Sequence, residues 1–372
     1  MATATTTSQT EWGATMTVAL KIWRFDPETG DRALKEYEFE APEWACLLDC
    51  LDIVKDRIDG TLAYRKSCRM MICGSCGMRM DGRAVLACKE RMKPIVARGH
   101  TPVISAMGNM PILKDLAVDM SPFWSKIRTV KPWLDPAYEE YPEKEFRHSQ
   151  EAMNPIHKEA LCIMCGCCVS ECNSMESDPE FFGPAALAKG FRFVGDPRDR
   201  TKIERLERLN DEHGIWDCTR CYFCNERCPK GVDPRDAIAK LGAESIREGI
   251  DRDMGAKHAK WFIRSTETTG WLRETELVPK TQGVVSAVQQ TKFALSLAKK
   301  GKVPLPFPPH VAERVREARA LRELVQGQGR EGAAGHVQGE RALARIEHTD
   351  AGSARRDTPE VTPGEAPPRA EG

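Results

Sequence analysis

The fifteen cysteines of this 372-residue chain constrain its fold more than any other feature of the sequence. All of them lie between Cys46 and Cys228, and the last 144 residues contain none. Residues 1–17 lack the basic start and apolar core of a secretory signal. We therefore expect a reducing compartment, where clustered cysteines bind metal more often than they form disulfides.

Composition narrows the classes of function. The 55 Lys and Arg residues are balanced by 55 Asp and Glu residues, so the formal net charge at pH 7 is zero. A protein that binds nucleic acid through phosphates needs a basic excess, and we therefore expect no nucleic-acid partner. No run of 18 apolar residues occurs, so we expect no transmembrane segment.

The first cysteine group has the spacing C-x4-C-x2-C-x11-C and consists of Cys68, Cys73, Cys76 and Cys88. This is the plant-type [2Fe–2S] spacing, with the fourth cysteine following closely. Gly74 and Gly77 fit a tight loop whose backbone N–H groups turn towards cluster sulfurs. Residues 78–87 predict a hairpin with a type I′ turn at Asp81-Gly82. A zinc ion is the alternative occupant of this group, but zinc fingers favour paired CxxC units.

Two further groups share the spacing C-x2-C-x2-C-x3-C of bacterial ferredoxins, in which the fourth cysteine ligates the other cluster. This pattern predicts one cubane cluster on Cys162, Cys165, Cys168 and Cys228, and a second on Cys172, Cys218, Cys221 and Cys224. Cys46 and Cys50 fall on an apolar helix face within residues 44–58, which predicts buried, non-ligating thiols. Cys167 should point away from its cluster. The eight histidines show no ligand spacing.

Hydrophobic periodicity predicts an α+β chain. Strands at 17–25 and 35–40, a helix and a cysteine loop indicate a β-grasp plant-type ferredoxin domain over 16–120, after a flexible 1–15. Prolines mark a linker at 121–150. An α-helical bacterial-type ferredoxin domain follows over 151–255, with Ile203, Leu206 and Leu209 as one apolar stripe. A helical extension over 256–326 contains an amphipathic segment at 284–300 and a further helix at 311–325, and we expect disorder over 327–372.

Longer motifs identify a family. The stretches AYRKSCRMMICGSC, VDMSPFWSKIRTVKPWL, DPEFFGPAAL, DPRDRTKIERLERLND and CPKGVDPRDAI resemble the iron–sulfur subunit of succinate dehydrogenase and fumarate reductase, respiratory complex II. The resemblance covers roughly residues 16–255. It implies a subunit that carries electrons between the FAD of a partner flavoprotein and quinone, held by membrane anchor subunits at the cytoplasmic side of the inner membrane. The substrate site would lie on the flavoprotein, because this chain has neither a flavin fingerprint nor an acid–base constellation.

The sequence departs from the family beside the third cluster. Most members lack a cysteine at the position of Cys221 and hold a [3Fe–4S] cluster on the positions matching Cys172, Cys218 and Cys224. The third cluster here is a second [4Fe–4S] cluster if Cys221 is a ligand, and a [3Fe–4S] cluster if the Cys221 thiol is turned away. Asn173 replaces the usual proline, and the aromatic pair that follows it in many members is absent. The quinone-side candidates flank the last-cluster ligands: Asn173, Ser174, Thr219, Arg220 and Lys230.

Residues 258–283 and 295–310 resemble the C subunit of heterodisulfide reductase. This second resemblance implies a different acceptor, a cysteine-rich heterodisulfide-reductase-like subunit. A relay for another flavin-linked dehydrogenase is a further alternative. The non-enzymatic alternative is an interaction protein stabilised by structural zinc ions, which would contain no iron or acid-labile sulfide.

Overall fold

The computed structural model describes residues 13–136 and 143–302, together with the isolated positions 311, 315, 317 and 320. Residues 1–266 and 272–308 form one compact unit, and residues 267–271 and 309–372 form a second. The sites discussed below belong to the first unit. None of the helices in the described ranges is long and apolar enough to span a bilayer.

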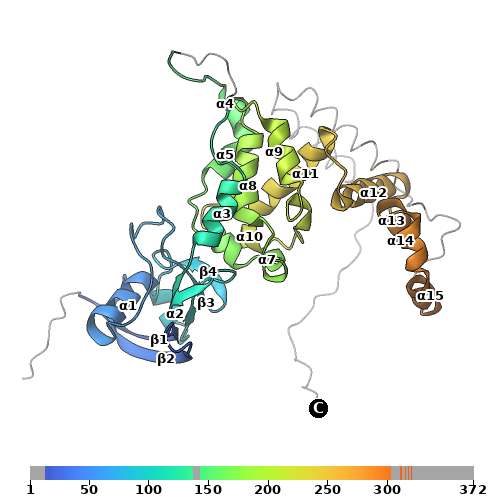
Figure 1. The fold of residues 1–372 in the computed structure, drawn as a ribbon. Coiled ribbons are helices and arrows are strands. Elements are labelled where there is room, and N and C mark those ends of the chain that lie inside the picture. Colours follow the sequence, from blue (N-terminus) through green and yellow to red (C-terminus); the bar gives the residue numbers. More distant parts are fainter. Residues whose placement is uncertain are drawn as a thin grey trace, which may run out of the picture. The chain divides into compact units, whose positions relative to one another are not determined.

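The N-terminal part of the chain, drawn in blue to cyan in Figure 1, is a sheet domain. Its five-stranded sheet has the order β2-β1-β5-β3-β4, with β1 antiparallel to β2 and parallel to β5. The strands are β1 (Thr15–Phe25), β2 (Arg32–Pro42), β3 (Gly77–Met80), β4 (Arg83–Leu86) and β5 (Val103–Ser105), and β6 (Ile112–Lys114) pairs with β7 (Ala117–Val118). Helix α1 (Leu47–Ile53) continues as a π-helix (Val54–Ile58), and α2 (Lys93–Val96) follows β4. Alternating β1 residues Val18, Leu20 and Ile22 are fully buried, as expected for a half-buried strand.

The green and yellow part of Figure 1 is a helical domain built around α8 (Gly183–Val194). Most of α8 is buried, because α3, α5, α9 and α11 all pack against it. The other elements are α3 (Ser121–Thr129), α4 (Gln150–Met153), a 3-10 turn (Asn154–Ile156), α5 (His157–Ala160), α6 (Cys167–Ser170), α7 (Asn173–Ser177), α9 (Lys202–Leu209), a 3-10 turn (Ile215–Asp217), α10 (Phe223–Arg227) and α11 (Pro234–Arg247). After them come α12 (Met254–Thr269), α13 (Glu274–Thr281), α14 (Val284–Gln289) and α15 (Thr291–Lys299).

Several local expectations agree with the structure, and two differ from it. Asp81 and Gly82 have φ values of 52° and 74°, which gives the type I′ turn. Helix α3 lies inside the predicted linker, since Pro122 occupies the first turn of the helix, where proline is tolerated. Ile203 is exposed, although Leu206 and Leu209 of the same stripe are buried. The expected flexible 1–15, the helix at 311–325 and the tail at 327–372 fall wholly or mostly outside the described residues.

A buried arginine joins the elements of the sheet domain. The Arg24 guanidinium on β1 donates to Asp115 at 2.9 Å, to the Tyr37 hydroxyl at 2.7 Å and to Thr61 at 2.9 Å, and it forms an ion pair with Asp59. Asp115 also accepts the backbone N–H groups of residues 25 and 63. The network therefore connects the sheet to the loop that leads into the first cysteine group.

We expect Arg24→Met to lower the stability of the sheet domain by about 3–5 kcal/mol, because it leaves the Asp115 carboxylate buried without a counter-ion. The control is Lys21→Met, which removes a surface ion pair with Glu36 and should cost less than about 1 kcal/mol. Thermal unfolding followed by circular dichroism and by cluster absorbance compares the two variants. Equal losses would contradict the role given to Arg24.

Candidate iron–sulfur sites

The loop between the π-helix and β3 presents backbone donors to its cysteine sulfurs. The N–H groups of Met70, Ile72 and Cys73 lie 3.4, 3.4 and 3.2 Å from Cys68 Sγ. Two further N–H groups, of residues 68 and 75, point at Cys73 Sγ at 3.5 Å. Such donors stabilise sulfur that carries negative charge, as in a ligated thiolate. The loop geometry thus fits an iron–sulfur cluster.

The pKa shifts of the cysteines in this loop reflect contacts between members of the first group. Burial opposes ionisation of Cys73, but hydrogen bonds from Ser75 and the Cys68 N–H lower its pKa to about 6. Burial raises the pKa of Cys76 to about 12, and its thiol shares a hydrogen bond with Cys88. Cys88 therefore lies beside Cys76, at the end of the β3–β4 hairpin.

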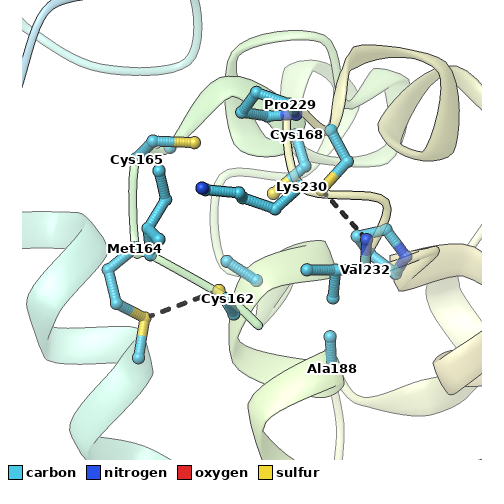
Figure 2. Close-up of a pocket in the computed structure, with 13 residues that line it drawn as sticks. Cys162, Met164, Cys165, Cys168, Ala188, Pro229, Lys230 and Val232 are labelled. Carbon is cyan, nitrogen blue, oxygen red and sulfur yellow. Dashed lines mark hydrogen bonds between the residues drawn. The ribbon is translucent and has the colours of Figure 1, made fainter. Parts of the chain in front are cut away.

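The second group lines a pocket at the start of α6 (Figure 2). Cys162 and Cys165 come from the loop before α6, Cys168 comes from the first turn of α6, and Cys228 follows α10. The Val232 N–H donates to Cys228 Sγ at 3.3 Å, one of the dashed lines in Figure 2. Burial raises the pKa of Cys168, and the charges of the other three thiols raise it further. The predicted set of four is thus gathered around one pocket, with the all-sulfur donor set that a cubane requires.

Cys167 and Lys230 lie beside the second group, one outside the pocket lining and one in it. Cys167 is fully buried and is not among the pocket-lining residues, but its thiol donates a hydrogen bond to Cys165, which lowers the pKa of Cys165 to about 7. Lys230, a quinone-side candidate, lines the pocket of Cys165 and Cys168 (Figure 2). Lys230 therefore lies beside the second group.

The third group combines three sheltered cysteines with an exposed one. Burial raises the pKa of Cys172, Cys218 and Cys224, that of Cys224 to about 12. The charge of Cys221 adds to the increase in each of the three, so its thiol lies near all of them. Cys221 itself is exposed at the surface. Cys221 is therefore the candidate for a fourth thiol in this group.

Hydrogen bonds hold the two cysteine segments of the third group together. The Thr219 N–H donates to Ser174 Oγ at 3.1 Å, which joins the residue after Cys218 to the start of α7. His213 and Asp178 form a second link, at 2.7 Å, and this carboxylate raises the pKa of His213. Two of the quinone-side candidates, Ser174 and Thr219, are thus partners of each other.

The three groups follow one another in space. A Cβ added at Gly74 would lie 2.8 Å from Cys165 Cα, and one added at Gly77 would lie 3.2 Å from the Cys165 carbonyl oxygen. The first cysteine loop is therefore in backbone contact with the second. The charge of Cys224 also acts on Cys168, which places the third group beside the second. Sequence reasoning gave both glycines to the cluster loop and missed their contact with Cys165, which depends on how the two domains pack.

A cavity of about 490 Å³ opens beside the third group. Its lining includes Trp216, Cys218 and Arg220 on one side and His258 and Gln282, from α12 and the end of α13, on the other. Arg220 is the quinone-side candidate in this lining. Residues 258 and 282 belong to the segment that resembles the C subunit of heterodisulfide reductase, but their place beside Cys218 could not be predicted from the sequence.

Family models agree with these sites. A 2Fe-2S iron-sulfur cluster binding domain matches residues 19–125, and a 4Fe-4S dicluster domain matches residues 160–232. Fold and sites together define an iron–sulfur electron-transfer protein with two ferredoxin-type domains, as the sequence predicts.

Known relatives identify the family. The chain is 36% identical over 243 residues to the fumarate reductase iron-sulfur subunit of Haemophilus influenzae, covering 62% of this chain and 94% of the relative. It is 33% identical to the 8-methylmenaquinol:fumarate reductase iron-sulfur subunit of Wolinella succinogenes, over 76% of this chain and 89% of the relative. A chain of the solved Mycobacterium smegmatis Sdh1 complex in the apo form aligns with a TM-score of 0.59 and 25% identity, over 64% of this chain and 99% of that one. The protein belongs to the iron–sulfur subunits of fumarate reductase and succinate dehydrogenase, which are electron-transfer subunits of oxidoreductase complexes.

The extension is partly shared within the family. Because 76% of 372 residues is about 283, the similarity to the Wolinella succinogenes subunit reaches past residue 255 into the extension. The resemblance that the sequence analysis places over residues 16–255 is therefore longer in this relative.

Proposed function

We propose that this chain relays single electrons between the FAD of a partner flavoprotein and a quinone. The observation that carries the proposal is the continuous series of cysteine groups, with the first loop in backbone contact with Cys165 and Cys168 beside Cys224. Bound clusters supply one-electron redox chemistry, while the protein sets their position and potential. In this arrangement the sheet domain faces the flavoprotein and the helical domain faces the acceptor, at the cytoplasmic side of the inner membrane with membrane anchor subunits.

The proposed ligands follow the three groups. Cys68, Cys73, Cys76 and Cys88 hold a [2Fe–2S] cluster, and Cys162, Cys165, Cys168 and Cys228 hold a [4Fe–4S] cluster. Cys172, Cys218, Cys224 and Cys221 hold a second [4Fe–4S] cluster in place of [3Fe–4S]. The gathered thiols and the N–H groups aimed at sulfur support these sets.

On the acceptor side we propose that Arg220 is the strongest of the quinone-side candidates, because it lines the cavity beside Cys218. Asn173, Ser174 and Thr219 lie next to ligands of the same group. A heterodisulfide-reductase-like acceptor is the second candidate. It is favoured by His258 and Gln282, which line this cavity and come from the segment that resembles that enzyme's C subunit.

Purification of the native complex tests the proposal. We expect a flavoprotein to co-purify, about ten iron atoms and ten acid-labile sulfides per chain, and cluster reduction by succinate. A quinone analogue as electron acceptor should support turnover. Zinc in place of iron, or clusters that succinate does not reduce in the presence of the flavoprotein, would overturn the proposal. If a cysteine-rich subunit co-purifies and turnover requires it, the acceptor is the heterodisulfide-reductase-like subunit.

Two neighbouring cysteines should respond in opposite ways. Cys168→Ala removes a proposed ligand, and we expect a loss of about one to four iron atoms per chain. Cys167→Ala should keep all the iron but lower the potential of the second cluster, because a hydrogen bond to Cys165 that favours the reduced state is lost. Iron analysis and a redox titration followed by EPR measure both effects. Equal iron loss in the two variants would contradict the assignment of Cys168 over Cys167.

A further inference from the structure

Helices α14 and α15 carry large apolar side chains at the surface. Val284, Val285 and Val288 on α14 are 72, 74 and 67% exposed, and Phe293 and Leu295 on α15 are 65 and 57% exposed. These two helices have no buried residue. Consecutive exposed apolar residues at this density mark an interaction surface and not ordinary surface scatter.

The lysines of α15 lie on one face of the helix. Lys292, Ser296 and Lys299 are spaced i, i+4 and i+7, so they form one polar stripe. The remaining surface carries the alanines, Phe293, Leu295 and Leu297, with Thr291 at the first position of the helix. A narrow basic stripe on an otherwise apolar helix is the pattern of a helix that lies in a membrane interface.

The sequence segment that holds these helices carries charge of a single sign. Residues 277–312 contain no Asp or Glu, although acidic and basic residues balance over the whole chain. The same 36 residues contain five lysines, at positions 280, 292, 299, 300 and 302. Segregation of this kind complements an anionic surface.

We propose that α14 and α15 bind the interface of an anionic phospholipid bilayer, with Phe293 and Leu295 at the acyl boundary and Lys292 and Lys299 at the phosphates. A nine-residue helix is about 13 Å long, less than half the thickness of the hydrocarbon core, so it lies in the plane of the interface. This contact belongs to the chain itself and does not depend on which acceptor the third group serves. A protein partner on the same surface is the competing occupant.

Flotation of the purified full-length chain, with its clusters, on vesicles tests the proposal. We expect binding to phosphatidylglycerol vesicles and little binding to phosphatidylcholine vesicles. Replacing Lys292, Lys299 and Lys300 together by Gln should weaken binding about a hundredfold at low salt. Phe293→Ser with Leu295→Ser should weaken it about tenfold or more. The exposed Leu113 on β6 provides the control, and Leu113→Ser should leave binding unchanged.

Unchanged cluster absorbance shows that each variant is folded. Equal binding to both vesicle types, no binding by the wild-type chain, or full binding by the Phe293 and Leu295 double variant would overturn the proposal. If that double variant instead binds vesicles normally and loses a co-purifying subunit, the surface docks a protein.

Discussion

Replacing Cys221 with valine is expected to convert the third cluster to a [3Fe–4S] form and to lower the iron content by about one atom per chain. The charge of Cys221 acts on Cys172, Cys218 and Cys224 alike, so its thiol lies near the other three and is the proposed fourth ligand. Cys221 is the exposed cysteine of that group, and the corner it leaves opens to solvent. Valine supplies no ligand, so one iron atom loses its protein ligand and leaves the cluster.

Low-temperature EPR distinguishes the two forms, because an oxidised [3Fe–4S] cluster is paramagnetic and an oxidised [4Fe–4S]²⁺ cluster is silent. The oxidised wild-type protein should be silent and the variant should give a signal. Cys50→Ala is the control, since Cys50 is fully buried in α1 and belongs to none of the three groups. A [3Fe–4S] signal in the wild-type protein that Cys221→Val leaves unchanged would remove Cys221 from the ligand set.

The local parts of the fold could be predicted from the sequence because their signals are local. Strand alternation places β1, and the Asp81-Gly82 pair places the β3–β4 turn. The cysteine spacings predict even the pairing of Cys228 with a loop 60 residues earlier, since ferredoxin chemistry dictates where the fourth thiol goes. What spacing cannot supply is domain packing.

The features that sequence reasoning missed depend on tertiary contacts. Strand β5 is three residues long and pairs with both β1 and β3, which no periodicity in so short a segment can indicate. Ile203 follows the helical period of Leu206 but lies outside the face that packs on the core. Lys230 follows Cys228 and therefore belongs to the second group, because the fourth cysteine of each run serves the other cluster.

Gly74→Ala is expected to impair transfer between the first two clusters and to destabilise the protein by more than backbone conformation explains. Gly74 has a φ of 71°, which costs an L-residue about 1–2 kcal/mol. Its new Cβ would also lie 2.8 Å from both Cys165 Cα and Cys165 Cβ, so one of the two loops must move. Forcing extra volume into such a contact costs about 1–3 kcal/mol more. A shift here separates the [2Fe–2S] loop from the [4Fe–4S] loop, and electron transfer weakens steeply with separation.

Gly82→Ala separates the two effects. Gly82 has nearly the same φ, 74°, but its Cβ would meet nothing within 4 Å. Both variants carry the same backbone strain, and only Gly74→Ala carries the clash. The unfolding temperature of Gly74→Ala should therefore lie below that of Gly82→Ala. Turnover per bound [2Fe–2S] cluster should fall in Gly74→Ala alone. If the two variants lose equal stability and keep equal turnover, the contact with Cys165 is not what positions the first cluster against the second.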